Sequence, residues 1–171
     1  MYYNTKMFKR VQCHLPWELF LTANYAEEYK EVAYGNTDPK IKTYTDTNTI
    51  HYQIFWDKDK VDFKLIGEQL NMQIDTISSI KQNPGFCIPP HRDYFYKLKQ
   101  KYNKKLPGLP VRVNIFAQDW QSGHFLQVDN EVITNWKQGD SYMWDSTPLH
   151  CSANAGLVPK YTVQVSGFLN G

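Results

Sequence analysis

The strongest constraint on the fold is a change in the pattern of apolar and turn-forming residues near residue 74. From there on, short apolar stretches are separated by turn-forming segments such as QNPG, LPGLP, KQGD and NAG. We predict eight strands, over residues 74–80, 85–88, 111–117, 124–128, 131–136, 140–145, 150–154 and 160–168. Closely spaced strands of this kind are typical of a double-sheet jelly roll or a barrel.

The first 73 residues have a mixed pattern. A helix is predicted over residues 16–35, because Pro16 stands near its start, apolar residues recur at helical spacing and Gly35 stands at its end. A strand over 50–56 and a weaker helix over 61–71 follow. We therefore expect a mainly β chain of the α+β type. It is predicted to form one domain, 1–171, with helical and strand support in 1–73 and a jelly roll or barrel in 74–171.

Composition sets limits on the cellular setting. Hydrophobic residues make up 42% of the chain, which is enough to bury a core. The three cysteines include no CxxC pair, so a disulfide framework is not expected and a reducing, cytoplasmic compartment fits. A net charge of +2 is too small to imply nucleic acid as the main partner. No apolar run approaches membrane-spanning length, so no membrane partner is expected.

The stretch IPPHRDYFY contains the first candidate ligands. His91 and Asp93 are two residues apart, and on extended backbone such side chains point to the same side. Pro89 and Pro90 hold the preceding backbone extended. Among the other histidines, His150 is best placed to join them, since it starts a predicted strand that can return beside them. Two histidines and one carboxylate on one face form the facial triad of a non-haem Fe(II) site.

Polar side chains recur along the last predicted strand. Every second residue there is polar, and the stripe consists of Lys160, Thr162, Gln164 and Ser166. Arg112 and Asn114 share one face of the strand over 111–117, opposite Val111 and Val113, and that face should look into the barrel. Polar stripes that face inward in a small barrel need a polar guest, and a lysine with a hydroxyl two residues later suits a carboxylate.

Residues from about 74 to 168 resemble the double-stranded β-helix (jelly roll, cupin-like) of the Fe(II)/2-oxoglutarate-dependent oxygenases, most closely their prolyl-hydroxylase-like branch. The resemblance implies that residues 74–171 form the catalytic core. The ordered motifs are HRD at 91–93, PLHCS around His150 and KYT at 160–162, together with VRVNIFAQDW and NWKQGDSYMWDS. The resemblance implies that His91, Asp93 and His150 bind Fe(II). It also implies that Lys160 and Thr162 bind the far carboxylate of 2-oxoglutarate.

One difference from this branch leaves open which residue binds the far carboxylate of 2-oxoglutarate. The branch mostly has arginine where Lys160 stands, and arginine offers a planar two-pronged donor that lysine lacks. Arg112 is therefore a competing anchor, ranked behind Lys160. Asn114 and Tyr142 are further candidates for lining the cosubstrate pocket.

Substrate contacts are harder to predict. Arg92 and Tyr94 flank the site, and Trp120 is a third candidate, although a core or rim position suits that tryptophan better. The insertion over residues 94–110 could be partly helical and act as a lid, as long loops near sites often do.

The resemblance implies a hydroxylase that uses Fe(II), 2-oxoglutarate and O₂. Such an enzyme would hydroxylate a C–H bond of a protein side chain, for example a prolyl residue, or of a small molecule, with release of succinate and CO₂. Two alternatives stay open. One is a cupin-type metalloenzyme that does not use 2-oxoglutarate, and the other is a non-catalytic jelly-roll binding module. The sequence predicts no oligomeric state.

Overall fold

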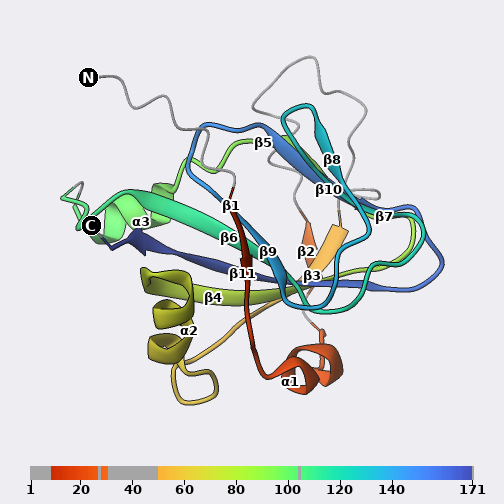
Figure 1. Cartoon of the computed structure of the whole chain (residues 1–171), viewed down its shortest axis with the longest axis horizontal. Coiled ribbons are helices and arrows are strands. Elements are labelled where there is room, and N and C mark those ends of the chain that lie inside the picture. The colour runs from red at the N-terminus through yellow and green to blue at the C-terminus, as the bar shows by residue number, and fades with distance from the viewer. Residues whose placement is uncertain (1–8, 27, 31–49, 104, 171) are drawn as a thin grey trace.

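Two antiparallel sheets face each other in this computed structural model, which describes residues 9–26, 28–30, 50–103 and 105–170 (Figure 1). The larger sheet has seven strands in the order β1-β9-β6-β11-β4-β3-β2, and the smaller has four in the order β5-β10-β7-β8. The larger sheet consists of β1 (Lys9–Gln12), β2 (Glu28–Lys30), β3 (Ile50–Phe55), β4 (Met72–Gln82), β6 (Pro110–Phe116), β9 (Asp140–Trp144) and β11 (Lys160–Leu169). The smaller consists of β5 (Cys87–His91), β7 (His124–Val128), β8 (Glu131–Ile133) and β10 (His150–Asn154).

The predicted fold class is confirmed. Each of the eight strands expected after residue 74 is present, although β4 is longer than predicted and β5 begins two residues later. The central pair, β4 and β11, is antiparallel and shifts register between Ser166 and Gly167. A Cβ atom at Gly167 would lie 2.0 Å from the Gln73 carbonyl oxygen, so only glycine allows this close strand contact.

The helix predicted over 16–35 is wrong beyond its first turns. Helix α1 spans only Trp17–Thr22, and Ala23 is extended. The Tyr25 hydroxyl donates to the Phe20 carbonyl at 2.7 Å, so a local side-chain contact takes up a carbonyl that a longer helix would use. Residues 28–30 pair with β3 instead, and residues 31–35 lie outside the described part. Sheet pairing thus overrides local helical spacing.

The second predicted helix is present as α2 (Phe63–Leu70). The Asp62 side chain caps it by accepting from the Leu65 backbone N–H at 2.9 Å, and Asn71 ends it in the left-handed conformation with φ 51°. Figure 1 shows α1 and α2 on the side of the larger sheet that faces away from the smaller one. No helix in the described residues is long and apolar enough to cross a membrane.

Alternating residues of the larger sheet contribute to two separate cores. One set packs against α1 and α2, and it includes Val111, Val113, Ile115, Val163 and Val165. The other set faces the smaller sheet, where it forms an apolar cluster of Phe116, Leu126, Val128, Ile133, Trp136 and Trp144. The space between the sheets is therefore apolar where this cluster lies, and polar side chains line the rest of that face.

The insertion between β5 and β6 contains a short helix, α3 (Tyr96–Lys101). Phe95 and Leu98 are buried against Phe168 of β11. Asp75 of β4 accepts from Lys101 at 2.6 Å and from the Tyr102 hydroxyl at 3.2 Å. The helix is thus held against the larger sheet by both apolar and polar contacts.

Candidate metal centre

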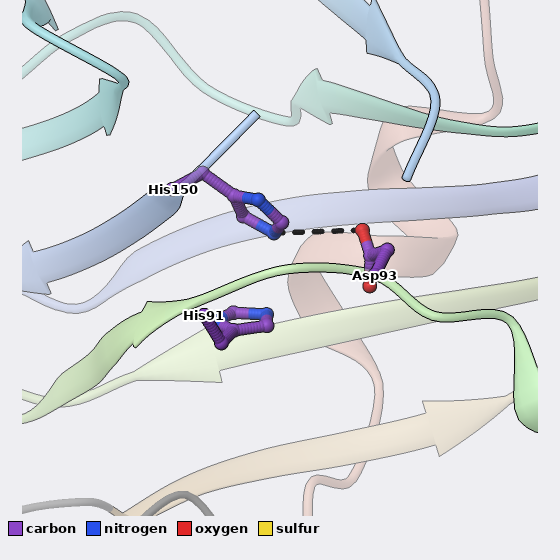
Figure 2. Close-up of side chains that lie close together, drawn as sticks. All are labelled: His91, Asp93 and His150. Carbon is purple, nitrogen blue, oxygen red and sulfur yellow. Dashed lines mark ion pairs between the residues drawn. The ribbon is translucent and has the colours of Figure 1, made fainter. Parts of the chain in front are cut away.

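Three predicted ligands lie together between the sheets. One potential ligand atom from each of His91, Asp93 and His150 can be chosen so that all lie within 4.8 Å of one another, a group that could hold a metal ion (Figure 2). His91 ends β5 and His150 begins β10, and the register of these antiparallel strands pairs the two directly. Their ring centroids are 4.2 Å apart, and His150 Nε2 is 3.4 Å from Asp93 Oδ2. Sheet pairing therefore brings together residues that are far apart in the sequence.

Both histidine rings are oriented by the backbone just before them. His91 Nδ1 lies 2.8 Å from the Pro89 carbonyl oxygen, and His150 Nδ1 lies 3.3 Å from that of Pro148. A carbonyl oxygen only accepts, so Nδ1 carries the proton in each ring and the lone pair is on Nε2. Fixing the tautomer through the other ring nitrogen is how proteins prepare histidine to bind a metal.

Asp93 is held by two donors from the larger sheet. Trp144 Nε1 donates to Oδ2 at 2.8 Å, and Arg112 Nη2 donates to Oδ1 at 3.2 Å. Trp144 and Arg112 are cross-strand neighbours on β9 and β6. The ligand segment after β5 is thereby connected to the face of the opposite sheet.

Burial and charge set the protonation of the three side chains. Burial lowers the pKa of His150 to about 4, with a further contribution from the neighbouring His91. Burial also lowers the pKa of His91. Burial by itself would raise the pKa of Asp93, but the Arg112 guanidinium and the two histidines outweigh it and hold that pKa below its usual range. Two neutral imidazoles and one carboxylate are the forms that bind a metal ion.

The strand registers arrange the polar stripe as rows across the inner face of the larger sheet. From the triad outward, the rows are Trp144, Arg112 and Ser166; then Tyr142, Asn114 and Gln164; then Phe116, Thr162 and Ile80; then Lys160 and Gln82. The Asn114 amide nitrogen is buried and has no hydrogen-bond partner among the described residues. An unused buried donor on this face is what a polar guest would satisfy.

Lys160 is the buried cation of this face. Its side chain is 1% exposed, and Nζ donates to the Phe125 carbonyl of β7 at 2.7 Å. Within the described residues no carboxylate forms an ion pair with it. Burial lowers the pKa of Lys160 to about 7. A buried amine without an anionic partner is costly, and an anionic guest would offset that cost.

The other candidate residues fall into three groups. Thr162 is buried on the inner face, and Tyr142 of the same face packs edge-on against Phe116 at 6.1 Å. Arg92 and Tyr94 are exposed, and they alternate with the ligands along the segment. The Trp120 indole donates to the His124 carbonyl at 2.7 Å and packs against the apolar cluster between the sheets. Core packing is thus what these contacts show for Trp120.

Two residues near the triad were not singled out from the sequence as site residues. Trp144 donates to Asp93, and its ring lies 4.7 Å from that of His150. His51 of β3 is 2% exposed, burial lowers its pKa to about 4, and the nearby His91 adds to that shift. The sequence signal that could have found Trp144 is its position two residues after Tyr142, which puts both side chains on one face of the strand, whereas no local signal indicates His51.

Comparison with known proteins supports the fold and leaves the activity open. No family model and no curated protein matches the chain. Among solved structures, it is similar to the non-heme alpha-ketoglutarate-dependent epimerase SnoN from nogalamycin biosynthesis, with TM-score 0.61, 10% identity, and coverage of 98% of this chain and 79% of that one.

Weaker likenesses have TM-scores of 0.44. One is to a predicted oxalate decarboxylase from Thermotoga maritima, at 12% identity over 70% of this chain and 82% of that one. Another is to a cupin domain of an XRE-family transcriptional regulator from Enterobacter cloacae, at 10% identity over 70% of this chain and 98% of that one. The two facing antiparallel sheets and the likeness to SnoN give the chain a double-stranded β-helix (jelly-roll) fold. This fold contains a His-Asp-His group that could bind a metal ion.

Proposed function

We propose that the chain is an Fe(II)- and 2-oxoglutarate-dependent oxygenase of the prolyl-hydroxylase-like type. The observation that carries the proposal is that the triad and the buried Lys160 line the same space between the sheets, and that no carboxylate among the described residues is paired to that lysine. A site for a metal next to a site for an anion is what a chelating keto acid with a second carboxylate requires.

The metal would be held by His91 Nε2, His150 Nε2 and one oxygen of Asp93. Nitrogen and carboxylate donors in this ratio suit Fe(II) and leave positions open for further ligands. When bound, the iron and the keto acid supply the oxidising chemistry with O₂, giving succinate, CO₂ and a hydroxylated C–H bond. The chain contributes the neutral histidines, the fixed carboxylate and the buried surroundings.

Lys160 is the proposed anchor for the far carboxylate, with Thr162 beside it on the same strand. Arg112 is the weaker candidate, because it donates to Asp93 and also to Gln164 Oε1. On β7, Val128 is opposite His150, and Phe125, the partner of Lys160, is opposite Ala153. A three-residue separation along a strand is about 10 Å, a span that a chelated dicarboxylate can bridge. Asn114 lies between these two ends and would donate to the guest.

The substrate we propose is a protein side chain, such as a prolyl residue, or a small molecule. Neither nucleic acid nor a membrane is part of the proposal. Arg92 and Tyr94 remain candidates for contacts outside the metal centre, since both are exposed beside the ligands. The cellular setting proposed is the cytoplasm.

Anaerobic titration tests the oxygenase directly. Adding 2-oxoglutarate to the Fe(II)-loaded protein should produce the weak visible charge-transfer band of a chelated keto acid, and the His91→Ala variant should show none. Iron binding without this band would favour the cupin-type metalloenzyme that does not use 2-oxoglutarate. A screen of peptides, amino acids and metabolites for stimulated succinate release would then identify the substrate.

A further inference from the structure

The two oxygens of Asp93 have different environments. Oδ2 faces His150 Nε2 at 3.4 Å and accepts from Trp144 Nε1 at 2.8 Å. Oδ1 accepts from Arg112 Nη2 at 3.2 Å. A carboxylate between two fixed donors cannot rotate without losing one of them, so its orientation is set before any metal binds.

Both donors are themselves held in place. Trp144 is 1% exposed, belongs to the apolar cluster between the sheets and lies against the His150 ring, with centroids 4.7 Å apart. Arg112 Nη1 donates to Gln164 on the neighbouring strand, and 23% of the Arg112 side chain is exposed. Two adjacent strands of the larger sheet thus fix a ligand that belongs to the connection after β5.

We propose that Trp144 and Arg112 are positioning residues that make Asp93 a ligand through a single oxygen, Oδ2. Trp144 orients Oδ2 toward the histidines, and Arg112 withholds Oδ1 from the metal. The protein then supplies three donor atoms, whereas a carboxylate binding through both oxygens would occupy one more position. This inference rests on the metal site of the proposed function and is independent of 2-oxoglutarate.

Cobalt(II) is the probe for the test, because the position and intensity of its visible absorption follow coordination number and geometry. Trp144→Phe keeps a ring against His150 but removes the N–H donor, and Trp136→Phe is its control. Trp136 is in the same apolar cluster, but its indole donates to the Gln118 carbonyl instead. We expect Trp144→Phe to bind Co(II) about 10-fold or more weakly, as is usual when a partner of a metal ligand is lost, and Trp136→Phe to bind like wild type.

Arg112→Met frees Oδ1 while keeping a long side chain, and Lys64→Met, which removes a cation at an exposed position of α2, is its control. The expected result is a Co(II) spectrum of changed intensity for Arg112→Met alone, because a second oxygen can then reach the metal. The half-buried position of Arg112 makes this variant decisive if Trp144→Phe does not fold.

Wild-type affinity and spectrum in both test variants would overturn the positioning role while leaving the oxygenase proposal in place. Conversely, if wild-type protein bound Co(II), both test variants showed the expected changes and Fe(II)-loaded protein gave no 2-oxoglutarate band, the oxygenase proposal would fail and the positioning role would stand.

Discussion

The protonation of Lys160 depends strongly on the groups that surround its buried amine. Its amine is almost fully enclosed, and it contacts the Phe125 carbonyl and the Trp136 ring, whose centroid is 5.9 Å from Nζ. Cys151 and His124 are the titratable groups whose charges interact with it. None of these supplies a full negative charge at neutral pH, so the protonated form is disfavoured in the folded state.

Because of the protonation of Lys160, the free energy of unfolding should therefore rise with pH. Its pKa is about 7 when folded and 10.5 as a free group, so between these values the unfolded chain binds more protons. The free energy of unfolding should increase by up to about 1.4 kcal/mol per pH unit over that interval. Urea denaturation at about pH 7 and about pH 9, without 2-oxoglutarate, measures the slope. Lys160→Met should lack this contribution, and equal slopes in the two proteins would argue against a depressed pKa.

Removing the same charge should weaken the binding of 2-oxoglutarate and leave the binding of the metal unchanged. We expect Lys160→Met to bind Co(II) like wild type but to bind 2-oxoglutarate about 10-fold or more weakly, since hydrogen bonds to charged groups contribute about 1.5–3 kcal/mol. Lys64→Met, at an exposed position on α2, is the matched control. Calorimetric titration of the Co(II)-loaded proteins gives both affinities. Unchanged 2-oxoglutarate affinity in Lys160→Met would show that another residue binds the far carboxylate.

Among the elements, α3 bears most directly on the proposed lid. Phe95 lies just before it in the left-handed conformation, with φ 52°, and is 7% exposed. Such a conformation is strained for an aromatic residue and persists only where packing holds it. Burial of Phe95 and Leu98 against Phe168, and the contacts of Asp75 with the helix end, provide that packing.

We therefore expect α3 to stay docked when the site is filled. Amide exchange of residues 96–101 should be unchanged by adding 2-oxoglutarate with a redox-inert metal. Leu98→Ala should destabilise the protein by about 2–5 kcal/mol and speed exchange in the helix, because it opens a cavity against β11. A large gain in helix protection on adding the ligands would instead support movement of the segment as a lid.

At the scale of the whole molecule, a bound metal would join β5 and β10, at the end of their pair where His91 and His150 lie, to the segment after β5. Ligands that bind only the folded state stabilise it by mass action. Co(II) at about 100 times its Kd should add about 2.7 kcal/mol, a rise in Tm of roughly 5–10 °C for a chain of this size. Differential scanning calorimetry with and without a chelator measures it.

The matched pair for this experiment is His91→Ala and His14→Ala. His14 is exposed, and its backbone groups, not its ring, bond to Gln69. The metal-dependent rise should vanish in the first variant and persist in the second. An equal rise in both would place the metal at a different site.

The sequence by itself determined the strands after residue 74 and the order of the candidate ligands. Period-two alternation and turn residues are local signals, and HRD fixes two ligands on one short segment. Local signals also misled, because helical spacing over 16–35 took no account of the Tyr25–Phe20 hydrogen bond or of the pairing of residues 28–30 with β3.

Only the tertiary structure decided which side chains surround Asp93. Trp144 and Arg112 reach it because β6 and β9 are neighbours in the larger sheet and face the segment that follows β5. His51 lies near His91 for a similar reason, because β3 pairs with β4 toward one edge of the larger sheet. These contacts depend on which strands become neighbours, and strand order arises from long-range pairing that no short stretch of sequence encodes.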